Sequence, residues 1–235
     1  MNSTALTPAD NNTEFAFDNV DPGSLSTSDT INAVFVVDES PSVRTYIHEL
    51  TKAYNDTKNK LATTHVKDQL LVSTVEFSDR ITRQSGFQPI VGLPDAAFAV
   101  SGDSTALYRS TLAALKNAMA YRENLEDSGI NCKTLLFVIS DGMDMDGASG
   151  RQAAQQVNDM IKGIMAQESN FNTFTAIFFG IGPNRAPFEE AKDLMGFQHL
   201  GVITDTPEQI RSMVDFISAS ISSAGMGQAQ SAPNF

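Results

Sequence analysis

Short apolar runs and helical apolar stripes alternate along most of the chain. Runs rich in β-branched or aromatic residues predict buried strands, and apolar residues at helical spacing predict the helices between them. Residues 81–90 alternate more weakly and contain Gly86, as expected for an edge strand. The predicted strands are 33–37, 70–77, 81–90, 135–140, 174–179 and 200–203, and the predicted helices are 43–62, the segment after Thr105, 153–164, 187–196 and 210–221.

This alternation predicts an α/β fold. Helical crossovers between strands favour a doubly wound, mainly parallel six-stranded sheet with helices on both faces. We expect residues 81–90 to be the one antiparallel edge strand. The pattern places one domain at residues 31–222, between a polar N-terminal extension (1–30) and a C-terminal tail (223–235). Neither flanking segment has a periodic apolar face, so we expect the domain to fold without them.

Composition excludes several functional classes. The chain has 235 residues, 41% of them hydrophobic, which suffices for one substantial core. Its formal net charge of −12 argues against partners with anionic surfaces, whether nucleic acids or membranes. Cys132 is the only cysteine, so neither an intrachain disulfide nor a thiolate metal cluster is expected. No signal peptide or membrane-spanning segment is recognisable, and we expect a cytoplasmic or virion-associated protein.

Oxygen-bearing side chains gather where the first predicted strand ends. Asp38, Ser40 and Ser42 follow the apolar run on alternate positions, and the helical pattern starts at Val43. Small oxygen ligands in a tight strand-to-helix turn suit a hard divalent cation. The alternative is that a serine caps the helix while Asp38 complements the helix dipole.

Two further segments favour the cation site. Asp141 ends the strand at residues 135–140, and Thr105 stands at the head of a helix. In a wound sheet, strand ends and helix starts of this kind meet at one rim, where such folds bind ligands. The acidic residues Asp144 and Asp146 lack the remaining ligands of a calcium loop, and we interpret them as part of a solvated loop.

The motif resembles that of a known family. Asp38-x-Ser40-x-Ser42, Thr105 in GDSTALY and Asp141 in SDG resemble the complete metal-ion-dependent adhesion site (MIDAS) of von Willebrand factor A (vWA) domains. The resemblance covers residues 31–222. It implies a vWA, Rossmann-like fold and a bound Mg²⁺ or Mn²⁺. It also implies that Ser40 and Ser42 are direct ligands and that the other three residues complete the site.

The residues favour binding over catalysis. Ser40 occupies the position where a phosphatase of the haloacid-dehalogenase type needs a second Asp, and neither a nucleophile elbow nor a phosphate-binding loop is present. We therefore expect a non-enzymatic module that binds a partner protein's Asp or Glu through the metal. The alternatives are a structural subunit of a large assembly, such as a virion or secretion machine, and, more remotely, a metal-dependent phosphatase.

Overall fold

The computed structural model describes residues 17–167, 173–227 and 232–233. Six strands form one sheet in the order β3-β2-β1-β4-β5-β6, and every neighbouring pair is parallel except β2 with β3. The strands are β1 (Asp29–Asp38), β2 (Leu70–Phe77), β3 (Ile81–Pro89), β4 (Asn131–Ser140), β5 (Phe174–Ile181) and β6 (His199–Ile203). The predicted fold class is confirmed, including the single antiparallel edge strand at residues 81–89.

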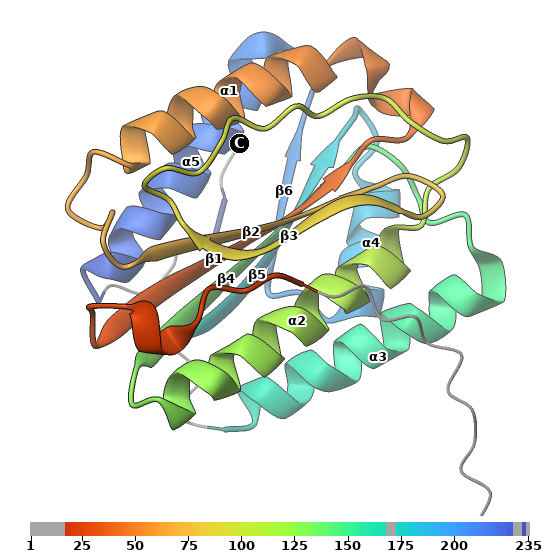
Figure 1. Cartoon of the computed structure of the whole chain (residues 1–235). Coiled ribbons are helices and arrows are strands. Elements are labelled where there is room, and N and C mark those ends of the chain that lie inside the picture. Colours follow the sequence, from red (N-terminus) through yellow and green to blue (C-terminus); the bar gives the residue numbers. More distant parts are fainter. Residues whose placement is uncertain (1–16, 168–172, 228–231, 234–235) are drawn as a thin grey trace, which may run out of the picture.

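Helices cover both faces of the sheet (Figure 1). One apolar cluster joins the sheet to α1 (Ile47–Leu61) and α5 (Pro207–Gly225). A second cluster joins the opposite face to α2 (Leu107–Asp127), α3 (Gly147–Met165) and α4 (Ala186–Met195). The central strand β1 is buried from its second residue to its last because both faces are covered, which explains its continuous apolar run.

The first helix differs from its prediction. The helical pattern predicted one helix over residues 43–62, but a 3₁₀ helix, η2 (Pro41–Thr45), comes first and α1 starts only at Ile47. Tyr46 separates the two helices with φ −128° and ψ −7°. This break lets the Tyr46 side chain turn inward, where it is 2% exposed.

Part of the N-terminal extension packs on the domain. β1 starts at Asp29, and the preceding 3₁₀ helix, η1 (Pro22–Ser24), leads into it. The Val20 amide donates to the Phe87 carbonyl at 2.9 Å, and the Phe87 amide donates to Asn19 Oδ1 at 2.7 Å. The segment therefore lies along the free edge of β3, beside α2 (Figure 1).

Gly86 is required for this close approach. A Cβ added at Gly86 would lie 2.2 Å from the Asp18 carbonyl carbon, so any other residue would push the segment off the strand. Phe17, Val20 and Leu25 are partly buried against the α2 side of the core.

At the other end of the domain, α5 continues to Gly225, three residues beyond the predicted boundary at 222.

Candidate functional site

The turn after β1 presents its serine side chains to neighbouring groups rather than to the helix. Ser40 occupies the N-cap position of η2, but its side chain makes no capping hydrogen bond. Instead, Ser40 Oγ lies 3.0 Å from Ser42 Oγ. Pro41 fits the first helical position because that residue needs no amide donor. The structure therefore does not support the capping alternative for Ser40.

A chain of oxygen atoms connects this turn to the end of β4. Ser42 Oγ donates to Asp141 Oδ1 at 2.7 Å and also contacts Ser40 Oγ. β1 and β4 are adjacent parallel strands, so residues that follow them meet at the same edge of the sheet. Three of the five predicted site residues are thus linked directly, although Ser42 and Asp141 are 99 positions apart.

Asp38, the last residue of β1, is hydrogen-bonded to the same turn. Its Oδ1 accepts the Ser40 amide at 2.8 Å, and its Oδ2 accepts the Ser140 hydroxyl at 2.5 Å. Asp38 is 1% exposed, so these bonds orient a carboxylate at the base of the site. Ser140 was not among the predicted site residues, although it stands directly before Asp141 at a strand end.

Thr105 also lies at this edge of the sheet, where β1 and β4 end, which we call the rim. Thr105 Oγ1 would lie 3.6 Å from a Cβ built on Gly142, so the threonine side chain packs beside the turn that carries Asp141. Thr105 is 5% exposed, and its carbonyl accepts the Met145 amide at 2.8 Å. The structure therefore brings all five predicted residues, Asp38, Ser40, Ser42, Thr105 and Asp141, to one edge of the sheet.

The long segment that delivers Thr105 is held by buried polar side chains. Glu39 is 4% exposed, and its carboxylate accepts the Ala99 amide and the Thr82 hydroxyl, each at 2.8 Å. Ser78 Oγ contacts the carbonyls of Ser101 and Ser104 at 2.8 and 2.9 Å. These contacts fix residues 99–104 although they contain no helix or strand. Glu39 and Ser78 could not be predicted from the apolar pattern, because their partners lie in a distant loop.

The loop after β4 is bound to the start of α2. Asp144 Oδ1 accepts the Tyr108 amide at 3.1 Å, and Asp144 Oδ2 accepts the Asp146 amide at 3.0 Å. Asp146 forms an ion pair with Arg109 of α2. Asp144 thus satisfies an N-terminal amide of α2, and the expectation of a merely solvated acidic loop is wrong for this residue. These bonds hold Thr105 and Asp141 in place relative to each other.

Burial raises the pKa values of three side chains at the rim. Desolvation raises the pKa of Asp38 to about 6, against hydrogen bonds from Ser140 and Ser40 that lower it. Desolvation also raises the pKa of Asp141, while the Ser42 hydroxyl lowers it. The Tyr46 hydroxyl pKa rises because the group is buried and because Asp141, Asp38 and Asp205 surround it with negative charge. The rim thus carries unfavourable negative charge that a cation would offset.

The donor set fits a hard divalent cation better than a soft one. Three neutral hydroxyls and two carboxylates offer only oxygen, as Mg²⁺ and Mn²⁺ prefer. Among the described residues, no group of three or more His, Cys, Asp or Glu side chains is placed to hold a metal. The candidate site therefore depends on hydroxyl ligands in addition to its two carboxylates.

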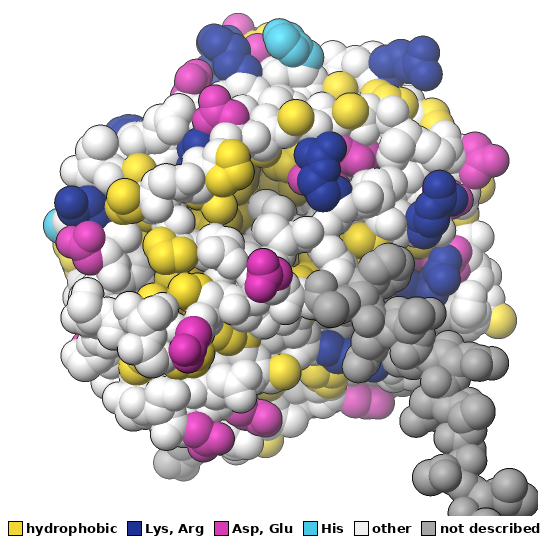
Figure 2. Space-filling view, viewed as in Figure 1, with side chains coloured by type: hydrophobic (Ala, Val, Ile, Leu, Met, Phe, Trp, Pro, Cys, Tyr) yellow, Lys and Arg dark blue, Asp and Glu magenta, His cyan; other side chains and the backbone are white. Residues whose placement is uncertain are grey.

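A pocket opens beside this rim. Its volume is about 480 Å³, and it is lined by the turns that follow β1, β4, β5 and β6. Asp141 and Ser42 form part of its wall, so any group held at the rim has space next to it. On the face shown in Figure 2, basic side chains are interspersed with acidic ones rather than gathered into one patch. That nucleic acid is not a partner stays a prediction from the net charge.

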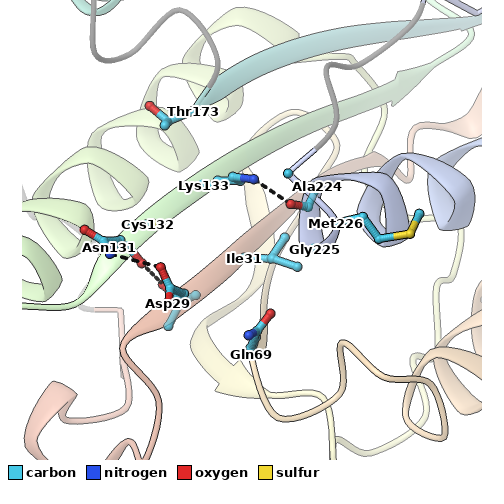
Figure 3. Close-up of a pocket in the computed structure, with 12 residues that line it drawn as sticks. Asp29, Ile31, Gln69, Asn131, Cys132, Lys133, Thr173, Ala224, Gly225 and Met226 are labelled. Carbon is cyan, nitrogen blue, oxygen red and sulfur yellow. Dashed lines mark hydrogen bonds between the residues drawn. The ribbon is translucent and has the colours of Figure 1, made fainter.

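A second pocket, of about 360 Å³, lies at the opposite ends of the strands, where β1 and β4 begin (Figure 3). Its charged groups already have partners within the protein. Lys133 Nζ donates to the Ala224 carbonyl at 2.6 Å, and Asp29 Oδ1 accepts the Asn131 amide group at 2.9 Å. Those contacts join β1, β4 and the end of α5, so we assign this pocket a structural role.

Similarity to known proteins lies in the fold. Searches against family models and curated proteins give no match. Among solved structures, the pilus adhesin SpaC from Lactobacillus rhamnosus GG aligns with a TM-score of 0.57 at 11% identity, over 84% of this chain and 30% of SpaC. The PilB minor pilin from Streptococcus sanguinis, as its D319A mutant, aligns with a TM-score of 0.57 at 10% identity, over 86% of this chain and 64% of PilB. The chain has a vWA-like α/β fold.

At these identities the likeness covers architecture alone. This chain spans less than two thirds of the length of SpaC and PilB. The VWA domain of SpRpn10 aligns less well, with a TM-score of 0.48 at 11% identity over 79% of this chain and 94% of that domain.

In the ranges that the structure describes, no helix combines the length and apolar character that crossing a bilayer requires.

Proposed function

We propose that this protein is a non-catalytic binding module that holds Mg²⁺ or Mn²⁺ at a MIDAS-type site and uses it to bind an Asp or Glu of a partner protein. The main support for the proposal is the hydrogen-bonded chain of oxygen atoms from Ser40 through Ser42 to Asp141. Asp38 accepts the Ser40 amide, and Thr105 packs beside the turn that carries Asp141. Neither of the two serine hydroxyls is used as a helix cap, so both are available as ligands.

Each residue has a distinct task in this proposal. Ser40, Ser42 and Thr105 supply neutral oxygen, while Asp141 supplies a partly exposed carboxylate. Asp38 is buried and bonded to Ser40 and Ser140, so it orients the turn and balances charge. A bound Mg²⁺ supplies a positively charged position at which a carboxylate replaces water. Because few of the ligands are charged, the ion would keep a strong affinity for a partner's carboxylate.

The same donor set is poorly suited to hydrolysis. No His, Lys or Cys is among the five residues, and the carboxylates are bonded to serine hydroxyls. A hydrolase needs a base within reach of its nucleophile. The metal-dependent phosphatase therefore stays the remote alternative.

A binding experiment tests the proposal. Immobilised wild-type protein is incubated with extract in Mg²⁺, washed, and eluted with EDTA, beside Ser40→Ala and Asp141→Ala columns. The matched control is Asp215→Asn, a change of an exposed carboxylate on α5. We expect proteins that elute with EDTA from the wild-type and control columns only, and free acetate should compete with them. Equal recovery from all four columns would show that the site does not capture partners.

A structural role in an assembly is the second candidate. It is supported by the folds of a pilus adhesin and a minor pilin, although their identities to this chain are 11% and 10%. In that case the protein would bind copies of itself or a fixed neighbour, with or without metal. Sedimentation of the purified protein over a range of concentrations, with Mg²⁺ and with EDTA, distinguishes the candidates: metal-independent self-association favours the assembly role. The cytoplasmic location stays a prediction.

A further inference from the structure

The pocket beside the rim has a distinct chemistry. It is about 480 Å³ in volume, and its charged lining residues are both acidic, Asp141 and Asp205. Among the described residues that line it, none is Lys, Arg or His. Arg185 lies nearby in sequence, but its guanidinium pairs with Glu189 at 2.8 Å. The pocket therefore has negative charge that its own wall does not neutralise.

Tyr46 adds an independent sign of a binding site. Its side chain is 2% exposed and lines the pocket, and its hydroxyl lies beside the Asp141 carboxylate without reaching the usual hydrogen-bond geometry to it. Asp141 and Asp205 are both close enough to act on this hydroxyl electrostatically. A buried hydroxyl that is not fully hydrogen-bonded is costly, so a ligand that completes its hydrogen bonding would be stabilised.

The rest of the lining suits an alkyl chain. Ile181, Pro183, Pro187 and Phe188 form apolar wall between the two carboxylates and the start of α4. A lysine or arginine side chain combines an apolar stem with a charged end, and such side chains bury the stem while the charge stays near water. Asp205 is exposed, which places its carboxylate where the end of such a chain would meet solvent.

We infer that this pocket binds a lysine or arginine side chain of the partner whose carboxylate is held at the rim. This inference rests on the proposed function and specifies the partner: a segment that carries an acidic and a basic residue close together. The acid would neutralise the bound cation, and the base would pair with Asp205. A bound divalent cation offsets the negative charge of Asp141, which weakens the attraction of the pocket for the base. The partner's carboxylate adds negative charge at the cation, so binding of the acid strengthens binding of the base.

The pocket is tested with n-butylammonium, which has the charge and stem of a lysine side chain, and with the neutral analogue 1-butanol. In EDTA, each is titrated into ¹⁵N-labelled protein while the amides of Gly182, Thr204 and Asp205 are followed by NMR. We expect butylammonium to shift these amides with a saturable curve, and the Asp205→Asn variant to weaken its binding about two- to fivefold. Asp215→Asn is the matched control and should bind as the wild type does.

Two results would overturn the inference. Equal affinity of butylammonium for wild type and Asp205→Asn would show that Asp205 does not select a cation. Equal shifts with 1-butanol would show that the pocket is only apolar. Repeating the titration in Mg²⁺, without and with acetate, separates this inference from the proposed function: Mg²⁺ should weaken butylammonium binding and acetate should restore it. If Mg²⁺ has no effect while Asp205 still matters, the metal site fails and the cation pocket stands.

Discussion

Replacing Asp38 with asparagine should change how stability depends on pH. Burial raises the pKa of Asp38 from 3.8 to about 6 in the folded protein. Well below pH 3.8 the group is protonated in both the folded and unfolded states, so it has little effect. As pH rises from about 4 to about 6, the unfolded state releases the proton first, and the wild-type protein loses stability. The asparagine of the variant is neutral throughout, so the variant avoids this loss.

The size of the effect follows from the two pKa values. The difference between 3.8 and about 6 corresponds to about 3 kcal/mol once both states are ionised. Asparagine can keep the bond from the Ser40 amide, and its own amide can donate to the Ser140 hydroxyl, which is free to turn. The pKa of Glu76 is also raised, to about 7, by burial and by Glu39, but this acts equally on both proteins and cancels in their difference.

Urea unfolding in EDTA between pH 4 and pH 8 measures this difference. The free energy of unfolding of Asp38→Asn minus that of wild type should rise by about 2.5 kcal/mol across the range, because the group is already partly ionised in the unfolded state at pH 4. Adding Mg²⁺ at 100 times its dissociation constant should then stabilise wild type by about 2.7 kcal/mol and stabilise the variant less, because asparagine does not balance the charge of the cation. A difference that stays constant with pH, or that favours wild type at pH 8 in EDTA, would refute the reasoning.

Two further predictions concern stability. Ser140→Ala removes the donor to the buried Asp38 carboxylate, and at pH 7 we expect a loss of about 1.5–3 kcal/mol in urea unfolding, whereas no change would mean that the bond is not formed. Deleting residues 1–28 removes the contacts of Val20 along β3 and should lower the melting temperature by more than about 4 °C. An equal effect from deleting residues 1–16 alone would contradict the role given to the contacts of residues 17–28.

The architecture was largely predictable because burial imposes a simple pattern. β1, β4 and β5 lie inside a sheet covered on both faces, so each reads as a continuous apolar run. β3 has a partner strand on one side only, and its weak alternation and Gly86 indicated an edge. The sequence did not reveal why glycine is needed there, since the Asp18 carbonyl approaches from 68 positions away.

The candidate site was predictable for a different reason. Asp38 ends one buried strand and Asp141 directly follows another, and parallel topology brings such positions together. The supporting residues were not predictable, because Glu39 accepts an amide of a distant loop and Asp144 accepts one from the first turn of α2. A hydrogen bond between segments that are remote in sequence leaves no periodic signal. The same holds for the break at Tyr46, which depends on the burial of that side chain.

The central claim is that the rim holds a divalent cation, and Mn²⁺ tests it most directly. Mn²⁺ prefers similar oxygen ligands to Mg²⁺ and broadens NMR signals near it. Substoichiometric Mn²⁺ should broaden the amides of Ser42, Thr105 and Gly142, while Lys133 at the opposite ends of the strands stays sharp, and excess Mg²⁺ should reverse the broadening. Ser42→Ala together with Asp141→Ala should abolish it. Unselective broadening, or broadening that survives in this double variant, would contradict a cation site at the rim.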